Sequence, residues 1–299
     1  MPCGISSIGG RTTRSASGGI ELAPAGDRRD PGARQGIRMI ALRRLTPLMR
    51  AARERLSATL RPWLPMVRRE AALLAAIVVA TASLVLFAQL TDEVFEGETH
   101  AFDTMVLLAL RDPADPADPV GPGWLEDLMR DVTALGSMGV LTIVSLAVVG
   151  FLILQGNRRT AVLVVLAVGG GMLVSMLAKA GFDRPRPDLV SHGARVYTTS
   201  FPSAHSMMAA VVYLTLGALL ARIQPYMRLR VYLIGLAAAL TMIVGFSRVY
   251  LGVHWPTDVL AGWTLGAAWA FGCWAVALGL QARGQIEADT RLPHDRGDM

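Results

Sequence analysis

Six apolar runs of helical length constrain this chain more than any other feature. The first, from Ala71 to Leu90, holds 20 residues without a charge, which is about the length needed to cross a bilayer core of roughly 30 Å. The others are Gly139 to Gln155, Ala161 to Ala178, Met207 to Ala221, Val231 to Phe246 and Val259 to Leu280. Barrel strands would be about ten residues long and would alternate apolar with polar side chains. The runs therefore predict an all-α, polytopic membrane protein with a bundle of six transmembrane helices.

Composition agrees with a membrane protein. Hydrophobic residues make up 53% of the 299 and charged residues only 17%, whereas soluble domains are about 25% charged. The two cysteines, Cys3 and Cys273, are too few and too far apart to predict a disulfide framework or a metal site. The net charge of +6 does not indicate nucleic-acid binding, because 14 arginines against 5 acidic residues lie in the first 70 positions. No obligate protein partner is indicated either.

The chain divides into four parts by composition. Residues 1–41 are rich in Gly, Ser, Pro and Arg without periodicity, which predicts a disordered basic N-terminus. Residues 42–70 alternate Arg with Leu and Ala, which predicts a basic amphipathic segment at the membrane surface. Residues 71–280 hold the six spans, and residues 281–299 form a tail.

Loop charges predict the orientation. The loops at Asn157 to Thr160 and Arg222 to Arg230 are basic, whereas Thr91 to Met138 carries 11 acidic residues and 2 Arg. By the positive-inside rule both termini and both basic loops are cytoplasmic, and the acidic segment faces outward. Within that segment, "THAFDTMVLLAL" and "GWLEDLMRDVTAL" predict amphipathic helices at the outer interface. Between them, "DPADPADP" predicts an extended, solvated loop rather than a metal site. We expect a plasma membrane protein, of bacterial inner-membrane type.

Polar residues gather at the ends of spans that this topology turns outward. Lys179, the only lysine, ends the third run, and Arg186-Pro187 follows it. "FPSAHS" (201–206) precedes the fourth run, and "FSRVYLGVHWPTD" (246–258) joins the fifth to the sixth. Charged residues at membrane depth are costly and usually functional. The clusters therefore predict one site at the outer face.

The residue types in these clusters suit a phosphate. Lys179, Arg186 and Arg248 are cations, and guanidinium groups bind phosphate through two hydrogen bonds. Ser203, Ala204 and His205 begin a helix, whose first-turn amides attract anions. His254 and Asp258 are four residues apart, so the carboxylate can orient the imidazole. No metal-ligand spacing is found among the spans, which favours phosphoryl transfer without a metal or other cofactor.

Three motifs in this order resemble the type 2 phosphatidic acid phosphatase superfamily, which also includes the vanadium haloperoxidases. "KAGFDRPRP" fits K-x6-R-P, "PSAH" is similar to P-S-G-H, and "SRVYLGVHWPTD" fits S-R-x5-H-x3-D. Ala204 departs from the family by replacing its usual glycine; we expect activity to be retained, although the methyl group could narrow the pocket. The resemblance covers about residues 71–280.

The resemblance implies a phosphatase that acts on a lipid phosphate or pyrophosphate through a phosphohistidine. His254 would be the nucleophile, Asp258 its orienting partner and His205 the general acid and base. Lys179, Arg186, Arg248, Ser203 and the amide at Ala204 would bind the phosphoryl oxygens. A lipid phosphotransferase with the same site stays open. A lipid transporter or flippase is less favoured, because the ionisable residues gather at one face.

Some residues beside the motifs have simpler interpretations. Arg184 and Arg195 hold no motif position, and we expect them to anchor the loop at the interface or to contact headgroups. His192 in the same loop is expected to face solvent. Lys179 taken alone could extend from a helix end to the interface, but Arg186 at the motif spacing favours the phosphate role.

Overall fold

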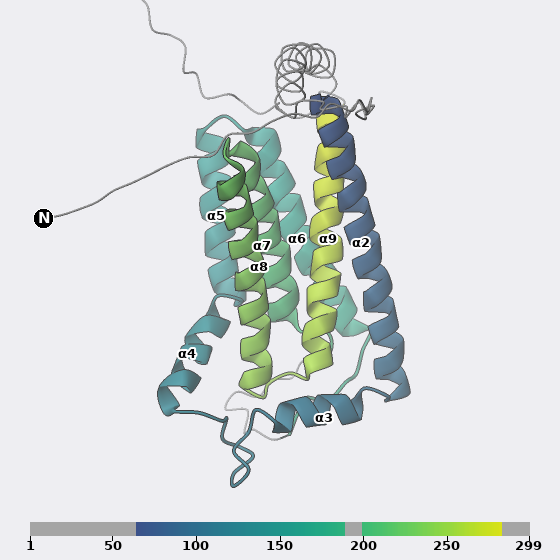
Figure 1. The fold of residues 1–299 in the computed structure, drawn as a ribbon, viewed down its shortest axis with the longest axis vertical. Helices are drawn as coiled ribbons and strands as arrows, with labels where there is room; N and C mark the ends of the chain where they lie inside the picture. Colours follow the sequence, from purple (N-terminus) through teal and green to yellow (C-terminus); the bar gives the residue numbers. More distant parts are fainter. Residues whose placement is uncertain (1–63, 189–198, 283–299) are drawn as a thin grey trace, which may run out of the picture. The chain divides into compact units, whose positions relative to one another are not determined.

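The structure, a computed structural model, describes residues 64–188 and 199–282. These residues form eight helices and no strand (Figure 1). They are α2 (Leu64–Glu96), α3 (His100–Leu108), α4 (Gly123–Ala134), α5 (Met138–Leu154), α6 (Arg158–Ala180), α7 (Ala204–Ile223), α8 (Met227–Tyr250) and α9 (Pro256–Ala282). The prediction of an all-α membrane protein is confirmed.

The predicted runs coincide with the long helices, which extend further at both ends except for α5, whose bounds are shifted by one residue. α2 begins at Leu64, so the end of the predicted segment 42–70 already belongs to the first spanning helix. Hydropathy finds the apolar middle of a span, whereas helical hydrogen bonding continues into the charged flanks. The predictions for residues 1–41, for most of 42–70 and for 283–299 lie outside the described residues. So do Arg195 and His192.

Five of the described helices are long and apolar enough to cross a membrane, and a sixth span results if α4 and α5 count as one bent unit. α5 has 17 residues, about 26 Å at 1.5 Å per residue, so it is slightly short for a bilayer core. α4 meets it at an angle of 47°. Ser137 caps the start of α5 by accepting a hydrogen bond from the Val140 amide at 3.3 Å. The chain therefore bends sharply at residues 134–138, between α4 and α5.

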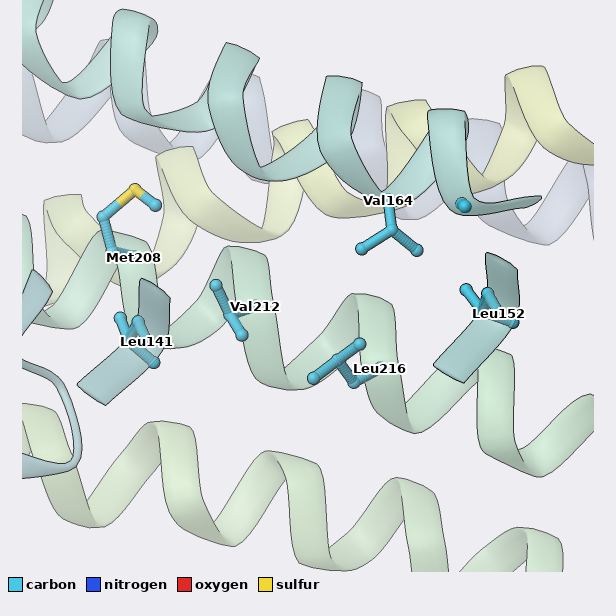
Figure 2. Close-up of a cluster of buried hydrophobic side chains, with 7 residues drawn as sticks. Leu141, Leu152, Val164, Met208, Val212 and Leu216 are labelled. Atoms are coloured by element: carbon cyan, nitrogen blue, oxygen red, sulfur yellow. The ribbon is translucent and has the colours of Figure 1, made fainter. Parts of the chain in front are cut away.

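α7 is the central helix of the bundle. It packs against α5, α6, α8 and α9, and more than half of its apolar window is buried, the largest share among the candidate spans. One core cluster joins α7 to α5 and α6 (Figure 2); it consists of Leu141, Leu152, Ala161, Val164, Met208, Val212 and Leu216. By contrast, α6 exposes Leu166, Leu173 and Leu177 on its outer side, as expected for a lipid-facing helix.

α3 lies across the end of the bundle where α8 stops and α9 begins, and α4 packs beside α8 near that end (Figure 1). α3 docks through Leu107, which is fully buried against Val249 of α8 and Val259 of α9. Both predicted segments are thus helical, and their place at the outer interface stays a prediction. Because the chain reverses between successive spans, the basic loops at 157–160 and 222–230 lie at the opposite end.

The "DPADPADP" segment is not the extended loop that its prolines suggest. Arg111 and Pro119 form an antiparallel bridge, and the Asp112 amide donates to the Asp118 carbonyl at 2.9 Å. The Asp112 carboxylate accepts from the Ala114 amide at 2.8 Å. Such local aspartate turns fold the loop back on itself, so the prediction of an extended loop is wrong.

Glycines on α9 allow it to approach α7 closely. A Cβ at Gly262 would lie 2.6 Å from the Ser203 carbonyl oxygen, and a Cβ at Gly266 would lie 2.5 Å from the Met207 carbonyl oxygen. These distances are far below van der Waals contact, and the neighbours are backbone atoms that cannot rotate away. Small residues one turn apart are the usual device for such close helix packing in membranes. This contact sets the start of α7 against the start of α9.

We expect Gly266→Ala to destabilise the bundle, since the added methyl group must separate α7 from α9. Overpacking of this kind costs about 1–3 kcal/mol. The matched control is Gly272→Ala on the same helix, where a Cβ meets no atom within 4 Å and where alanine is the better helix former. Thermal unfolding in detergent should show a lower midpoint for Gly266→Ala only. Equal midpoints would mean that the close approach does not limit stability.

Candidate active site

The three motifs meet at one end of the bundle. Lys179 lies in the last turn of α6, Ser203 caps α7, Arg248 lies in the last turn of α8 and Asp258 lies in the first turn of α9. His254 lies in the short connection between α8 and α9. Helices thus fix most of the predicted side chains, and Ser203 is joined to the third motif because its amide donates to the Asp258 carbonyl at 2.9 Å.

His254 and Asp258 form the buried centre of the cluster. His254 Nδ1 lies 3.4 Å from Asp258 Oδ2, and their side chains are 2% and 0% exposed. The same oxygen accepts a hydrogen bond from the Trp255 amide at 3.0 Å and a short one from the Ser200 hydroxyl. The predicted spacing of four residues therefore does bring the carboxylate to the imidazole.

Arg186 contacts the other nitrogen of the same imidazole. Its Nη1 lies 3.2 Å from His254 Nε2 and donates to the Val253 carbonyl at 2.9 Å. A guanidinium can only donate, so Nε2 accepts and the ring proton belongs on Nδ1, toward Asp258. This arrangement assigns the tautomer in which Nε2 carries the free electron pair.

Burial keeps the His254 imidazole uncharged. Removal from solvent lowers its pKa from 6.5 to about 4, against the opposing hydrogen bond and charge of Asp258; Arg248 and Arg186 lower it further. An imidazole with this pKa is neutral at physiological pH. It can therefore act as a nucleophile without first losing a proton.

Lys179 points back into the protein rather than away from it. Its Nζ donates to the Thr199 carbonyl at 2.8 Å, and the Thr199 hydroxyl donates to the Lys179 carbonyl at 3.2 Å. These reciprocal bonds tie the end of α6 to the segment that enters α7. Lys179 therefore contacts the protein chain here instead of extending to the interface.

Arg248 has a donor that the protein leaves unused. Its Nη1 donates to the Thr133 hydroxyl of α4 at 3.1 Å. Its Nε is buried, and no described residue accepts a hydrogen bond from it. Buried donors are nearly always paired, so an unpaired guanidinium N–H in a cationic cluster indicates a place for an anionic ligand.

The start of α7 presents the second motif. The Ser203 side chain is buried and accepts from the Ser206 hydroxyl at 2.9 Å, which leaves its own proton available. Ala204 is the first helical residue, so its backbone is right-handed and alanine fits without the freedom of glycine. His205 lies close enough to Arg248, His254, Arg186 and Lys179 to interact with their charges.

Arg184 belongs to the site, contrary to its interpretation as an interfacial anchor. Its side chain is only 15% exposed, and it donates to Asp258 Oδ1 at 2.7 Å and to Asp103 Oδ2 at 2.6 Å. Asp103 of α3 and Ser200 were also missed. The doubled Arg-Pro in "DRPRP" and a single acid in the apolar run of α3 were the available signals.

Within residues 64–188 and 199–282, no group of three or more His, Cys, Asp or Glu side chains could hold a metal ion. The arrangement combines a buried, neutral imidazole, a second histidine and three motif cations. These groups can bind a phosphoryl group, attack it and transfer a proton.

Comparisons with known proteins agree with this geometry. A sequence model of the PAP2 superfamily matches residues 160–281. Phosphatidylglycerophosphatase B of Bacillus subtilis is 34% identical over 146 residues, which cover 48% of this chain and 70% of that protein. Decaprenylphosphoryl-5-phosphoribose phosphatase of Mycobacterium tuberculosis is 33% identical over 129 residues, covering 41% and 64%.

A solved structure shares the fold. The crystal structure of a transmembrane PAP2-type phosphatidylglycerolphosphate phosphatase from Bacillus subtilis aligns with a TM-score of 0.58 and 26% identity. The alignment covers 68% of this chain and 96% of the other. The extent of these matches, together with the three motifs at one end of the bundle, shows that this chain belongs to the PAP2 superfamily.

Proposed function

We propose that this protein is a membrane-embedded phosphatase that removes phosphate from a lipid phosphate or pyrophosphate through a phosphohistidine, without a metal. The observation that carries the proposal is His254, a buried imidazole with Nδ1 toward Asp258 and Nε2 toward a motif arginine. The named functions of the relatives support the lipid substrate, since two of them are phosphatases of lipid phosphates.

The first step forms a bond between His254 Nε2 and phosphorus while the bond from phosphorus to the lipid oxygen breaks. His205 donates a proton to that leaving oxygen, so the lipid departs as an alcohol or as a monophosphate. In the second step His205 takes a proton from water, and the water oxygen attacks phosphorus as the N–P bond breaks. Phosphate leaves, His254 is neutral again and His205 is protonated again. Asp258 stabilises the positive charge that develops on the imidazole.

The cations stabilise charge that collects on the equatorial oxygens in the transition state. This stabilisation comes from Lys179, Arg186 and Arg248, together with the Ser203 hydroxyl and the first amides of α7 at Ala204. Because Arg186 contacts His254 Nε2 directly, it exchanges this contact for a phosphoryl oxygen when the nucleophile attacks. Substrate binding thereby releases His254 Nε2 from Arg186.

The position of the site supports a lipid substrate. The motif residues lie at the ends of candidate membrane spans, where a phosphate in the headgroup region can enter while its acyl or isoprenoid chains stay among lipids. Phosphatidate, phosphatidylglycerol phosphate and undecaprenyl pyrophosphate are substrates of this kind. An undecaprenyl-diphosphatase of Sulfolobus acidocaldarius is 40% identical over 68 residues, 23% of this chain and 29% of that protein.

The distribution of charge favours an active site on the outer side of the plasma membrane. The loops at 157–160 and 222–230 carry arginines and lie at the end opposite the site, whereas the acidic segment 91–138 lies beside it. By the positive-inside rule the basic end and both termini are cytoplasmic.

His254→Ala should abolish turnover of any lipid phosphate that the wild-type protein accepts, because it removes the atom that attacks phosphorus. His205→Ala should slow both steps and leave phosphoenzyme detectable after rapid quenching of a reaction with ³²P-labelled lipid. The control is the amount of folded protein recovered from detergent. Activity of His254→Ala near that of the wild type would show that another group is the nucleophile.

The His254 imidazole should titrate near pH 4, because burial lowers its pKa to about that value. Protonation would favour unfolding between pH 6.5 and 4, since the unfolded chain binds the proton more tightly there. NMR of ¹³C-labelled histidine in detergent measures the titration, and His254→Gln assigns the signal among the 5 histidines. A midpoint near 6.5 would mean that the ring is solvated.

Purified protein should release inorganic phosphate from a lipid phosphate without any added acceptor, which distinguishes hydrolysis from phosphate transfer. A panel of the three lipid classes above, with phosphate detected colorimetrically, identifies the substrate. EDTA should leave the rate unchanged. Release that requires a lipid or sugar alcohol would favour a phosphotransferase, and strong inhibition by EDTA would indicate a metal-dependent step.

A further inference from the structure

Asp103 is a fully buried carboxylate that belongs to none of the three motifs. It lies in the first turn of α3 with 0% exposure. Its Oδ1 accepts from the Thr257 amide at 2.9 Å, and its Oδ2 accepts from the Thr257 hydroxyl at 2.6 Å. Oδ2 also accepts from Arg184 Nη2 at 2.6 Å. Both oxygens thus contact α9 or the arginine beside it.

The sequence of α9 explains one part of this arrangement. Trp255, which precedes the first helical residue, has no side-chain acceptor to cap the helix, so the Thr257 amide needs an oxygen from elsewhere. Asp103 supplies it from α3, and its negative charge is favourable at a helix N-terminus. Leu107, four residues further and on the same face, anchors α3 in an apolar cluster.

Arg184 connects this carboxylate to the site. Nη2 binds Asp103 and Nη1 binds Asp258 Oδ1 at 2.7 Å and the Thr257 hydroxyl at 2.8 Å. The planar guanidinium can serve two carboxylates in different directions, which a lysine ammonium cannot do with the same geometry. With Oδ1 held by Arg184, Asp258 directs Oδ2 to His254.

We propose that Asp103 and Arg184 are positioning residues that act through Asp258 on His254. Arg184 holds the Asp258 carboxylate in place, but its positive charge reduces the attraction between that carboxylate and the imidazole. The negative charge of Asp103 offsets this reduction. The proposal rests on the proposed function in that His254 is taken as the nucleophile. Neither residue contacts the reacting atoms, and Asp103 lies outside the matched segment 160–281.

The two residues have opposite electrostatic effects on His254. Removing the cation Arg184 leaves the charge of Asp258 less neutralised and therefore raises the pKa of the imidazole. Removing the anion Asp103 then lowers it again. Other charges facing the ring are Arg186 from the loop after α6 and Arg248 from α8, with His205 from α7; the substitutions below leave all three in place.

The test compares Arg184→Gln with the double variant Arg184→Gln/Asp103→Asn in the full chain in detergent. By NMR, the His254 titration should move to higher pH in Arg184→Gln, within the measurable range of pH 4 to 6.5, and return toward the wild-type value in the double variant. A structural cap alone predicts no such reversal. A titration that does not move, or that moves further upward in the double variant, overturns the proposal.

Kinetics give a second readout. Arg184→Gln and Asp103→Asn should each lower kcat by roughly tenfold to a hundredfold, the range expected when a hydrogen-bonded partner that orients a functional imidazole is lost. KM should stay within about twofold, since neither side chain touches the substrate. A rise in KM with kcat unchanged would overturn the positioning role. If Asp103→Asn alone does not fold, the shift of the His254 titration in Arg184→Gln still tests the proposal.

Arg111→Met is the matched structural control. Arg111 is another buried arginine at this end of the bundle, 3% exposed, and it donates to the Tyr250 carbonyl at 2.7 Å. Its loss should reduce thermal stability but leave the His254 titration and kcat per folded molecule unchanged. The titration needs no turnover, so it tests the roles of Asp103 and Arg184 even if no lipid phosphate is hydrolysed. Failure of this inference is therefore distinguishable from failure of the proposed function.

Discussion

The buried carboxylate of Asp258 is the interaction on which the rest of the site depends. An isolated buried charge costs several kcal/mol, and removing one partner of a buried pair is more damaging than never having made the pair. Asp258 avoids this cost through Arg184, the Ser200 hydroxyl and the Trp255 amide, besides His254. These partners come from different stretches of the chain. The charge is therefore tolerated only when the loop after α6, the approach to α7 and the start of α9 are all in place.

The formal charges of the cluster also suit its proposed ligand. Lys179, Arg184, Arg186 and Arg248 contribute four positive charges and the proposed proton donor His205 a fifth, whereas Asp103 and Asp258 contribute two negative ones, so three positive charges remain while His254 is neutral. A phosphate monoester carries about −1.5 to −2 at pH 7. The ligand would thus neutralise half or more of this positive charge. The buried Nε–H of Arg248, for which no described residue supplies an acceptor, shows the same need for an anionic ligand.

Sequence reasoning found the spans and motif residues because both depend on local patterns: apolar length for α6 to α9, and fixed spacing for His254 and Asp258. It misjudged Arg184 and missed Asp103, since their importance arises only when α3 folds over the start of α9. No spacing rule joins residues 81 positions apart. It also treated the aspartates and prolines of residues 112–119 as extended, because turns closed by side-chain oxygens are not visible in hydropathy.

The segment between the first two long spans acts as part of the site rather than as a covering loop. α3 supplies Asp103 to Arg184, and the last turn of α4 supplies Thr133 to Arg248. Both contacts are polar and reach arginines near the His254 imidazole, and both Asp103 and Thr133 lie outside the matched segment 160–281. Since α3 is held by Leu107 and α4 packs against α8, the packing of these two helices positions the partners of two guanidinium groups.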